Sequence, residues 1–439
     1  MIEVADRVLP VSADVSDSGV LAIGGMPVTE LAKEFGTPLY IYDEATLRAN
    51  MRRYVNALSA NYPDALPLYA SKAYSDPHVV KIAAEEGMGL DVVSAGEIAV
   101  GVAAGFPLDR MYFHGNNKLP EELAYALEAG VGRIVVDNFN EIDLLNTIAG
   151  QAGKRAQILL RIGPGVEAHT HDYIKTGALD SKFGFALPIG QAEEAVARAQ
   201  AAPHLDLIGL HAHIGSQIFD IEPYVDTLDL LIQFAQDMTD KYGLQMTELS
   251  PGGGWGIRYT GADDPPPIED LAETVAVTVK DRMAALGWDL PRLVVEPGRS
   301  IVGQAGVGLY AVGSSKTIPD VRKYVAVDGG MADNIRPALY DALYTVLVGN
   351  RMHDPAEETV TIAGRYCESG DVLFKDIAMP VLNPGDLIAV PSSGAYCLAM
   401  SSNYNLVPRP AVVLVNDGDA RLIRRRETLD DLIQPHLDV

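Results

Sequence analysis

A repeated alternation of strand-like and helix-like segments most constrains how this chain can fold. Short apolar, β-branched runs predict strands, and the amphipathic stretches between them, such as Glu121–Ala129 and Tyr224–Tyr242, predict helices. Repeated strand–helix units build a parallel sheet, and eight of them predict a TIM-like (β/α)8 barrel of the α/β class. The eight predicted strands are Leu66–Ala70, Gly89–Val93, Met111–His114, Arg133–Val136, Gln157–Ile162, Leu207–His213, Met246–Ser250 and Arg292–Glu296.

The pattern changes after Ile301, where strand-length runs rich in Val, Ile and Gly predict a β-rich domain of sandwich or barrel type. The N-terminal segment shows no second core and is expected to add a strand to that domain, which would bring both chain ends together. We therefore expect a barrel domain over residues 38–301 and a β domain built from residues 1–37 and 302–439. The strand-like Leu39–Tyr42 and the helix Glu44–Ala57 would precede the first barrel strand.

Net charge and cysteine content narrow the classes of function. The formal net charge is −25 at pH 7, whereas nucleic acids and anionic membranes require basic patches, so a small-molecule partner is favoured. The sequence shows no secretory leader pattern and no apolar stretch long enough to cross a bilayer, which predicts a cytoplasmic protein. Cys367 and Cys397 are too few for a disulfide framework or a cysteine zinc site, so each is either inert or catalytic.

Unusual polar residues fall at the predicted carboxyl ends of the barrel strands, where such barrels carry their catalytic groups. A Gly-rich turn after strand seven and an Arg after strand eight match the usual place of a bound phosphate, although three glycines often form only a turn. The residues in question are Lys72, His114, Asn116, Arg161, His211, His213, Gly252, Gly253, Gly254, Glu296 and Arg299.

Lys72 and Glu296 select the chemistry. A lysine amine that is partly desolvated beside other charges can lose its proton near neutral pH, as a covalent bond to an aldehyde cofactor requires. A carboxylate against the pyridine nitrogen of pyridoxal 5'-phosphate (PLP) keeps that nitrogen protonated and strengthens the ring as an electron sink. Glu296 could instead simply pair with Arg299, so the cofactor prediction depends on the combination of residues.

Two histidine pairs, His169 with His171 and His211 with His213, have a spacing that resembles metal ligands on a strand. They suggest a rival class, the metal-dependent barrel hydrolases. We favour this class less, because such enzymes place paired histidines on the first strand, where this chain has Lys72. No metal is expected, and a histidine stacked on a planar cofactor accounts better for His213.

Ten separated motifs together resemble one family over nearly the whole chain: the fold-type III PLP decarboxylases and, within them, the diaminopimelate decarboxylases. The resemblance implies an alanine-racemase-like barrel. The motifs are YASKA around Lys72, GLDVVSAGE at Gly89–Glu97, FHGNNK at Phe113–Lys118, SKFGF at Ser181–Phe185, HAHIGSQI at His211–Ile218, GGGWGIRY at Gly252–Tyr259, EPGRSIV at Glu296–Val302, VDGGMADNIRPALYDA at Val327–Ala342, CESGDVL at Cys367–Leu373 and GAYCLAMSSNYN at Gly394–Asn405.

The resemblance implies a role for each matching residue. Lys72 would hold the cofactor covalently, His213 would stack on its ring and Glu296 would face its pyridine nitrogen. Other implied cofactor contacts are Ser216, Gly252, Gly253, Gly254, Gly298, Arg299 and Tyr396, and the implied substrate contacts are Arg299, Arg336, Tyr340, Glu368 and Tyr396. Diaminopimelate has a second amino-acid head, so its pocket needs cations for a distal carboxylate as well as an acid for the distal ammonium. Ornithine or lysine needs only the acid.

Cys367 resembles the family's catalytic thiol, which protonates the carbanion after CO2 leaves, and Cys397 is expected to be structural. In the family the loop of this thiol reaches a partner subunit, which implies a homodimer with active sites at the interface. The expected reaction is decarboxylation of meso-2,6-diaminopimelate to L-lysine, the last step of lysine biosynthesis. The alternatives are a decarboxylase of ornithine, lysine, arginine or carboxynorspermidine, and, less favoured, a non-catalytic PLP-binding homologue.

Overall fold

The protein is described by a computed structural model over residues 8–166 and 181–437. The chain separates into two compact units. The barrel unit consists of Asn50–Gly256 and Pro265–Gly298, and the β unit consists of Met1–Ala49, Ile257–Asp264 and Arg299–Val439.

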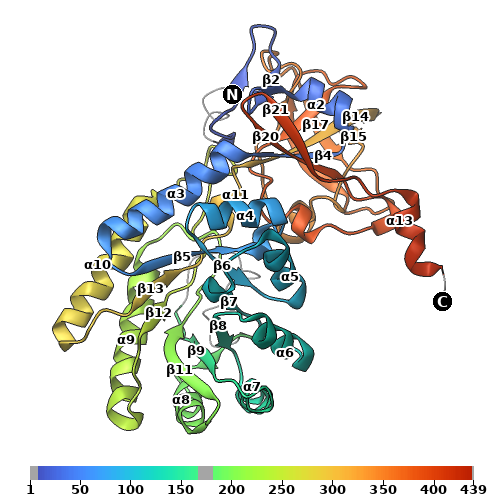
Figure 1. Ribbon diagram of the computed structural model, residues 1–439. Helices are drawn as coiled ribbons and strands as arrows, with labels where there is room; N and C mark the ends of the chain where they lie inside the picture. Colours follow the sequence, from blue (N-terminus) through green and yellow to red (C-terminus); the bar gives the residue numbers. More distant parts are fainter. Residues whose placement is uncertain (1–7, 167–180, 438–439) are drawn as a thin grey trace. The chain divides into compact units, whose positions relative to one another are not determined.

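Eight parallel strands close the barrel unit into a ring, because β5 pairs with both β6 and β13 and β8 pairs with β9. Figure 1 follows these strands from blue at β5 to yellow at β13. All eight predicted strands are confirmed, and a further short strand, β10 (Phe185–Ala186), pairs with β9. The strands are β5 (Ala65–Ala70), β6 (Gly89–Val92), β7 (Met111–Phe113), β8 (Arg133–Val136), β9 (Ala156–Gly163), β11 (Leu205–His211), β12 (Glu248–Ser250) and β13 (Arg292–Val295).

Helices of the barrel unit begin and end at residues suited to those positions. Asp76, Ser94 and Asn138 each cap a helix N-terminus by accepting a backbone N–H with their side chains. Glycines in the left-handed conformation end four helices, including Gly105 and Gly243. The helices are α4 (Pro77–Glu85), α5 (Ala95–Ala104), α6 (Pro120–Ala129), α7 (Phe139–Gln151), α8 (Gln191–Ala201), α9 (Glu222–Tyr242) and α10 (Ile268–Leu286), and α3 (Glu44–Asn61) precedes them.

The core between the barrel strands is one compact apolar cluster, with one side chain from each of six strands. Beside it, Glu248 accepts hydrogen bonds from the Tyr112 hydroxyl at 2.8 Å and from Arg133 at 2.6 Å. A packed interior is what a closed eight-stranded barrel requires, and it leaves the carboxyl ends of the strands for function. The clustered residues are Leu68, Tyr112, Val135, Leu159, Ile208 and Val294.

The β unit is built on a mixed sheet with the strand order β18-β17-β15-β14-β4-β20-β21, in which β19 also pairs with β14 and with β16. A small sheet, β1-β2-β3, and helix α2 precede it. The elements are β1 (Asp14–Val15), β2 (Leu21–Ile23), β3 (Met26–Pro27), α2 (Val28–Phe35), β4 (Leu39–Asp43), α11 (Arg299–Val302), β14 (Gly306–Ile318), β15 (Arg322–Val327), α12 (Arg336–Tyr340), β16 (Leu347–Val348), β17 (Glu358–Ala363), β18 (Val372–Met379), β19 (Leu387–Val390), β20 (Ala411–Asn416), β21 (Asp419–Arg424) and α13 (Leu429–Ile433).

Strand β4 joins the two ends of the chain, since it lies antiparallel to β14 and parallel to β20. The predicted β-rich domain is therefore confirmed, but the N-terminal strand of its sheet does not come from residues 1–37, and β4 lies within the range expected for the barrel domain. The contributing strand is Leu39–Asp43, which the sequence placed just ahead of the first barrel strand. All five of its residues are buried, as in a strand covered on both faces. Such an apolar run does not reveal which of two sheets it enters.

Among the helices of residues 8–166 and 181–437, none has the length and apolar character needed to cross a membrane.

Candidate active site

Lys72 lies in a short 3-10 turn, Ser71–Ala73, directly after β5. Its Nζ is 3.9 Å from Oδ2 of Asp91, which β6 carries. The Lys72 side chain is 41% exposed and that of Asp91 only 1%. The predicted lysine thus keeps an accessible amine while a buried carboxylate stands beside it.

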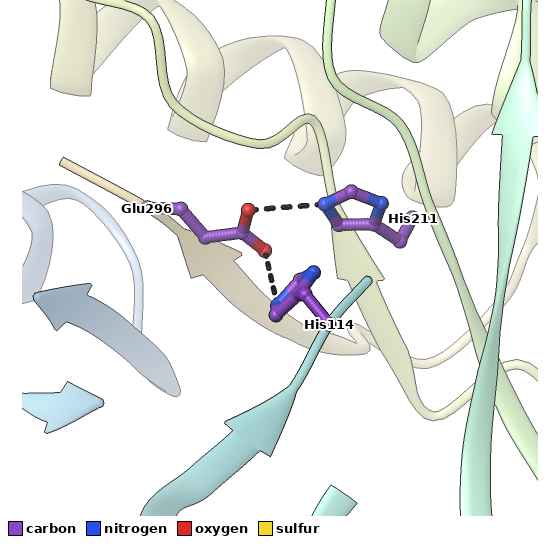
Figure 2. A group of neighbouring side chains, drawn as sticks. All are labelled: His114, His211 and Glu296. Atoms are coloured by element: carbon purple, nitrogen blue, oxygen red, sulfur yellow. Dashed lines mark hydrogen bonds and ion pairs between the residues drawn. The ribbon is translucent and has the colours of Figure 1, made fainter. Parts of the chain in front are cut away.

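Glu296 directly follows β13, and its carboxylate is held by two other strands. Ser250 donates a hydrogen bond to Oε1 at 2.9 Å, and Nε2 of His211 lies 3.0 Å from Oε2. Figure 2 shows His211 and His114 pointing toward this carboxylate, with Nε2 of His114 at 3.7 Å from Oε1. Burial would raise the pKa of Glu296, but the two histidines hold it well below its ordinary value. Glu296 therefore remains a buried anion.

His114 lies between two carboxylates, because its Nε2 is also 3.7 Å from Oδ1 of Asp91. Burial lowers the pKa of His114 well below its ordinary value. Burial likewise raises the pKa of Asp91 to about 7, against the opposing charge of Lys72. Nε2 of His114 and Oδ1 of Asp91 have no hydrogen-bond partner among the described residues. We call Lys72, Asp91, His114, His211 and Glu296 the barrel cluster.

The glycine turn after β12 has no room for side chains. A Cβ on Gly253 would lie 1.9 Å from the carbonyl oxygen of Glu296, and one on Gly254 would lie 2.3 Å from that of Gly215. Gly252 has φ +81°, and its Cβ would lie 2.8 Å from Nδ1 of His213. The turn therefore needs glycine for close backbone packing alone, and phosphate binding here stays a prediction.

His213 lies two residues after the end of β11, where its Nδ1 accepts a hydrogen bond from the backbone N–H of Gly253 at 3.3 Å. Burial and the charges of Lys72 and Arg161 lower the pKa of His213 well below its ordinary value. A neutral imidazole suits stacking against an aromatic ring. Ser216 follows in the same loop, and a Cβ on Gly298 would lie 3.0 Å from that of Ala70.

The structure also locates the remaining barrel candidates. Arg161 is carried by β9, with its guanidinium 4.3 Å from the ring centroid of Phe183 and 3.8 Å from Asp137. Asn116 lies in the loop after β7, where its backbone carbonyl accepts a hydrogen bond from Asn138. His169 and His171 lie outside the described residues.

A metal could be held within the described residues by His114, His211 and Glu296, whose ligand atoms lie within 4.8 Å of one another. The histidine spacing noted in the sequence does not build this group, because His213 is not part of it. Both Glu296 oxygens already serve His211 and Ser250. The buried Glu296 carboxylate, with polar atoms that lack hydrogen-bond partners nearby, would also accept a hydrogen bond from a protonated ring nitrogen.

In the β unit, two predicted arginines lie among tyrosines. Arg299 donates to the Tyr259 hydroxyl at 2.5 Å, and its guanidinium is 4.9 Å from the ring centroid of Tyr396. Arg336 donates to the Tyr344 hydroxyl and lies 4.6 Å from the ring centroid of Tyr259. Both arginines are 7% exposed. We call these five residues the arginine cluster.

The other predicted residues of the β unit divide into exposed and buried. Cys367 and Glu368 are exposed. The backbone N–H of Cys367 donates to Asn405 at 2.8 Å, and the Tyr404 hydroxyl donates to Cys367 O at 3.4 Å. Cys397 is buried beside the Tyr344 hydroxyl at 3.4 Å, as a structural cysteine would be. Tyr340 ends α12, which Arg336 begins.

Sequence reasoning did not single out Asp91, Tyr259 or Tyr344. Asp91 and Tyr259 belong to motifs that the sequence did identify, GLDVVSAGE and GGGWGIRY. A charged residue inside an otherwise apolar strand was an available signal for Asp91. Tyr259 and Tyr344 have no such signal, because a buried tyrosine is common in any core.

The barrel cluster fits the cofactor predicted from the sequence. It offers an accessible lysine amine, a buried carboxylate held as an anion and buried polar atoms without partners. An aldehyde cofactor with a ring nitrogen could bond to Lys72 and share a proton with Glu296.

Comparisons with known proteins agree with this chemistry. A family model, the pyridoxal-binding domain of pyridoxal-dependent decarboxylases, matches residues 45–303, more than half of the chain. The diaminopimelate decarboxylase of Bacillus subtilis is 49% identical over 95% of both chains. That of Mycobacterium tuberculosis is 45% identical over 99% of this chain and 98% of its own.

A solved structure is similar as well. The diaminopimelate decarboxylase of M. jannaschii, in a co-complex with L-lysine, superposes with a TM-score of 0.91 at 34% identity and covers 98% of both chains. Near-complete coverage at this level of identity confirms the predicted family and cofactor class. The chain belongs to the diaminopimelate decarboxylase family of PLP-dependent enzymes.

Proposed function

We propose that this protein decarboxylates meso-2,6-diaminopimelate to L-lysine and CO2, the last step of lysine biosynthesis, with PLP as its cofactor. The observation that carries the proposal is identity of 44–49% with curated diaminopimelate decarboxylases over nearly the whole of both chains. A reaction shared by relatives of this similarity also supports the predicted cytoplasmic location.

When bound, PLP supplies an electron sink for the electrons of the carbon–carbon bond that breaks as CO2 is lost. In the proposed site Lys72 would hold the cofactor, and the buried carboxyl group of Asp91 lies 3.9 Å from the lysine amine. Glu296, which His211 and Ser250 keep as an anion, would hold a proton on the ring nitrogen. His213, which burial keeps neutral, would lie flat against the ring.

We assign substrate recognition to the arginine cluster and Glu368. Burial would lower the pKa of the Arg336 guanidinium, but the phenols of Tyr259 and Tyr344 raise it above its ordinary value. No carboxylate among the described residues forms an ion pair with Arg336. A buried cation in this state is stabilised by an anionic ligand, which supports a substrate with a distal carboxylate. Glu368 would accept the distal ammonium, with Tyr340 and Tyr396 completing the pocket.

Cys367 would donate the proton that replaces CO2. Its exposure supports the predicted homodimer, because a thiol that acts in a water-excluding site needs a covering surface. Asn405, which accepts the hydrogen bond of Cys367 within the same chain, lies between two exposed hydrophobic side chains. Leu406 is 62% exposed and Tyr404 is 39% exposed. A second copy of the chain would bury this surface and bring Cys367 to the cofactor of its partner.

The direct test is release of CO2 and formation of lysine from meso-diaminopimelate by the PLP-loaded protein. L-ornithine, L-lysine, L-arginine and carboxynorspermidine serve as comparison substrates. We expect kcat/KM for diaminopimelate to exceed the others by at least about a hundredfold, since a buried cation left without its anion costs about 3 kcal/mol or more. Faster turnover of any comparison amine would contradict the substrate assignment and leave the cofactor assignment intact.

A further inference from the structure

We propose that Tyr259 is a positioning residue that fixes the spacing of Arg299 and Arg336 and thereby makes the site specific for ligands with a distal carboxylate. This inference deepens the proposed function and rests on it for the role of the two arginines. It concerns a side chain that bears no charge.

One ring contacts both cations. The Tyr259 hydroxyl accepts a hydrogen bond from Nη1 of Arg299 at 2.5 Å, while the face of the ring lies 4.6 Å from the guanidinium of Arg336. Edge and face of an aromatic ring differ in electrostatic character, and the face attracts cations. The guanidinium of Arg299 also lies 5.8 Å from the centroid of this ring. Tyr259 therefore holds Arg336 through its ring and Arg299 through its hydroxyl and ring together, which sets the distance between them.

The ring itself is held rigidly, so the spacing it sets is fixed. The backbone N–H of Tyr259 donates to Asp263 at 3.0 Å, and its carbonyl accepts from Thr345 through both the backbone N–H at 2.8 Å and the hydroxyl at 3.0 Å. Tyr344 packs edge-on against the ring with centroids 5.1 Å apart. Tyr259 is only 5% exposed. A side chain anchored at backbone and ring has little freedom to reorient.

The chemical character of the Tyr259 side chain matters as much as its position. A carboxylate at this position would neutralise the guanidinium groups and compete with a carboxylate ligand. A phenol orients both groups without removing their charge. Both guanidinium groups lie within 6 Å of the centroid of the same buried ring, at 5.8 Å for Arg299 and 4.6 Å for Arg336. Like charges in a buried site repel each other, and a ligand carboxylate would relieve that repulsion. Ligands without the carboxylate gain nothing from the arrangement.

The test compares ligands that differ in the carboxylate alone. Holoenzyme variants Tyr259→Phe and Tyr259→Leu are assayed with diaminopimelate, and L-lysine and cadaverine are used as competing ligands. Tyr310→Phe is the matched control, because Tyr310 is also buried in the β unit and its hydroxyl lies 3.3 Å from that of Tyr40. Calorimetry measures direct binding of L-lysine and cadaverine to each protein.

For Tyr259→Phe we expect the KM for diaminopimelate and the inhibition constant of L-lysine to rise about tenfold, as for loss of a hydrogen bond to a charged group. Tyr259→Leu should raise them further, because it also removes the ring face. The inhibition constant of cadaverine and the cofactor absorbance should not change. Tyr310→Phe should leave all four values as in the wild type.

Equal weakening of L-lysine and cadaverine by Tyr259→Phe would overturn the proposal and indicate a general structural role. No change in either ligand would overturn it as well. Should the wild type fail to turn over diaminopimelate, the proposed function would fall, while the calorimetric difference between L-lysine and cadaverine would still decide the role of Tyr259. Should Tyr259→Leu not fold, Tyr259→Phe alone gives the answer.

Discussion

The barrel cluster and the arginine cluster differ in how their buried charged groups are paired. In the barrel unit Asp91, His114, His211 and Glu296 face one another at 3.0–3.7 Å, and the charge of one group sets the protonation of the next. In the β unit Arg336 is surrounded by phenols and aromatic rings, with no carboxylate partner among the described residues.

The difference shows two uses of a low-dielectric site. Pairing within the protein fixes the charge of a resident group, because the hydrogen bonds of His211 and Ser250 keep Glu296 anionic. Absence of internal pairing leaves charge available for a ligand, as with Arg336. The first arrangement suits a resident cofactor, and the second suits a substrate that comes and goes.

The largest expected effect comes from placing a defect of the barrel unit, at Lys72, and a defect of the β unit, at Cys367, on different chains. Lys72→Ala should lose the cofactor absorbance and at least about a thousandfold in kcat, because covalent attachment and orientation of the cofactor are lost together. Cys367→Ala should retain the absorbance and lose turnover. In a homodimer with shared sites, half of the randomly mixed dimers carry one intact site, so mixing the two variants should restore about a quarter of wild-type activity.

Lys81→Ala, a substitution at an exposed lysine on α4, is the control and should behave as the wild type. No recovery on mixing, with subunit exchange verified by tagged chains, would show that each chain builds its site alone.

A smaller effect is expected from removing the unpaired cation. Arg336→Met should raise the KM for diaminopimelate by about tenfold to a hundredfold. Its melting temperature should change little, because the contacts with Tyr259 and Tyr344 are lost while a buried charge without a carboxylate partner is removed. Glu296→Gln is the matched counterpart, and it should lower the melting temperature since His211 and Ser250 lose a charged acceptor. Scanning calorimetry of both variants as apoproteins measures the two melting temperatures. Equal destabilisation of the two variants would contradict the proposed difference between the arginine cluster and the barrel cluster.

A third effect concerns Asp91 and is a change in the pH dependence of stability. Burial raises its pKa from 3.8 to about 7, so the folded protein keeps a proton that the unfolded chain has already lost. Asp91 therefore contributes stability that is complete below pH 3.8 and is lost as the pH rises through 7. In the apoprotein, Asp91→Asn should remove up to about 1.4 kcal/mol per pH unit from the decline of the unfolding free energy between pH 4 and 7.

Urea titrations at pH 5 and 7.5 measure this change, with Asp143→Asn, at an exposed carboxylate on α7, as the control. Parallel pH dependence in wild type and Asp91→Asn would argue against a raised pKa.

The fold was largely predictable, because strand and helix periodicities are local properties of the sequence. Arg133–Val136, for example, was predicted with the bounds that the structure shows. The sheet that a strand enters is not a local property, as β4 shows, because its run of four aliphatic and aromatic residues, Leu39–Tyr42, fits the centre of either sheet.

Candidate site residues can be named from the sequence where their chemistry marks them, and they cannot where only their position in the fold does. Lys72 and Glu296 stand at strand ends, and a lysine or glutamate there calls for an explanation. Tyr259 has the composition of an ordinary core residue, and its contact with two arginines depends on segments 40 and 77 residues further along the chain. No pattern in the sequence reports such a contact.

The position of β4 also bears on the order in which the protein is made. Every barrel strand has been synthesised by Val295, while β4, from the beginning of the chain, must wait for β20 at Ala411–Asn416 before its second edge is paired. A nascent chain released before β20 would leave the edge of an apolar strand open to other chains. Truncations near the C-terminus should therefore aggregate through β4, even though they leave every residue of the barrel unit in place.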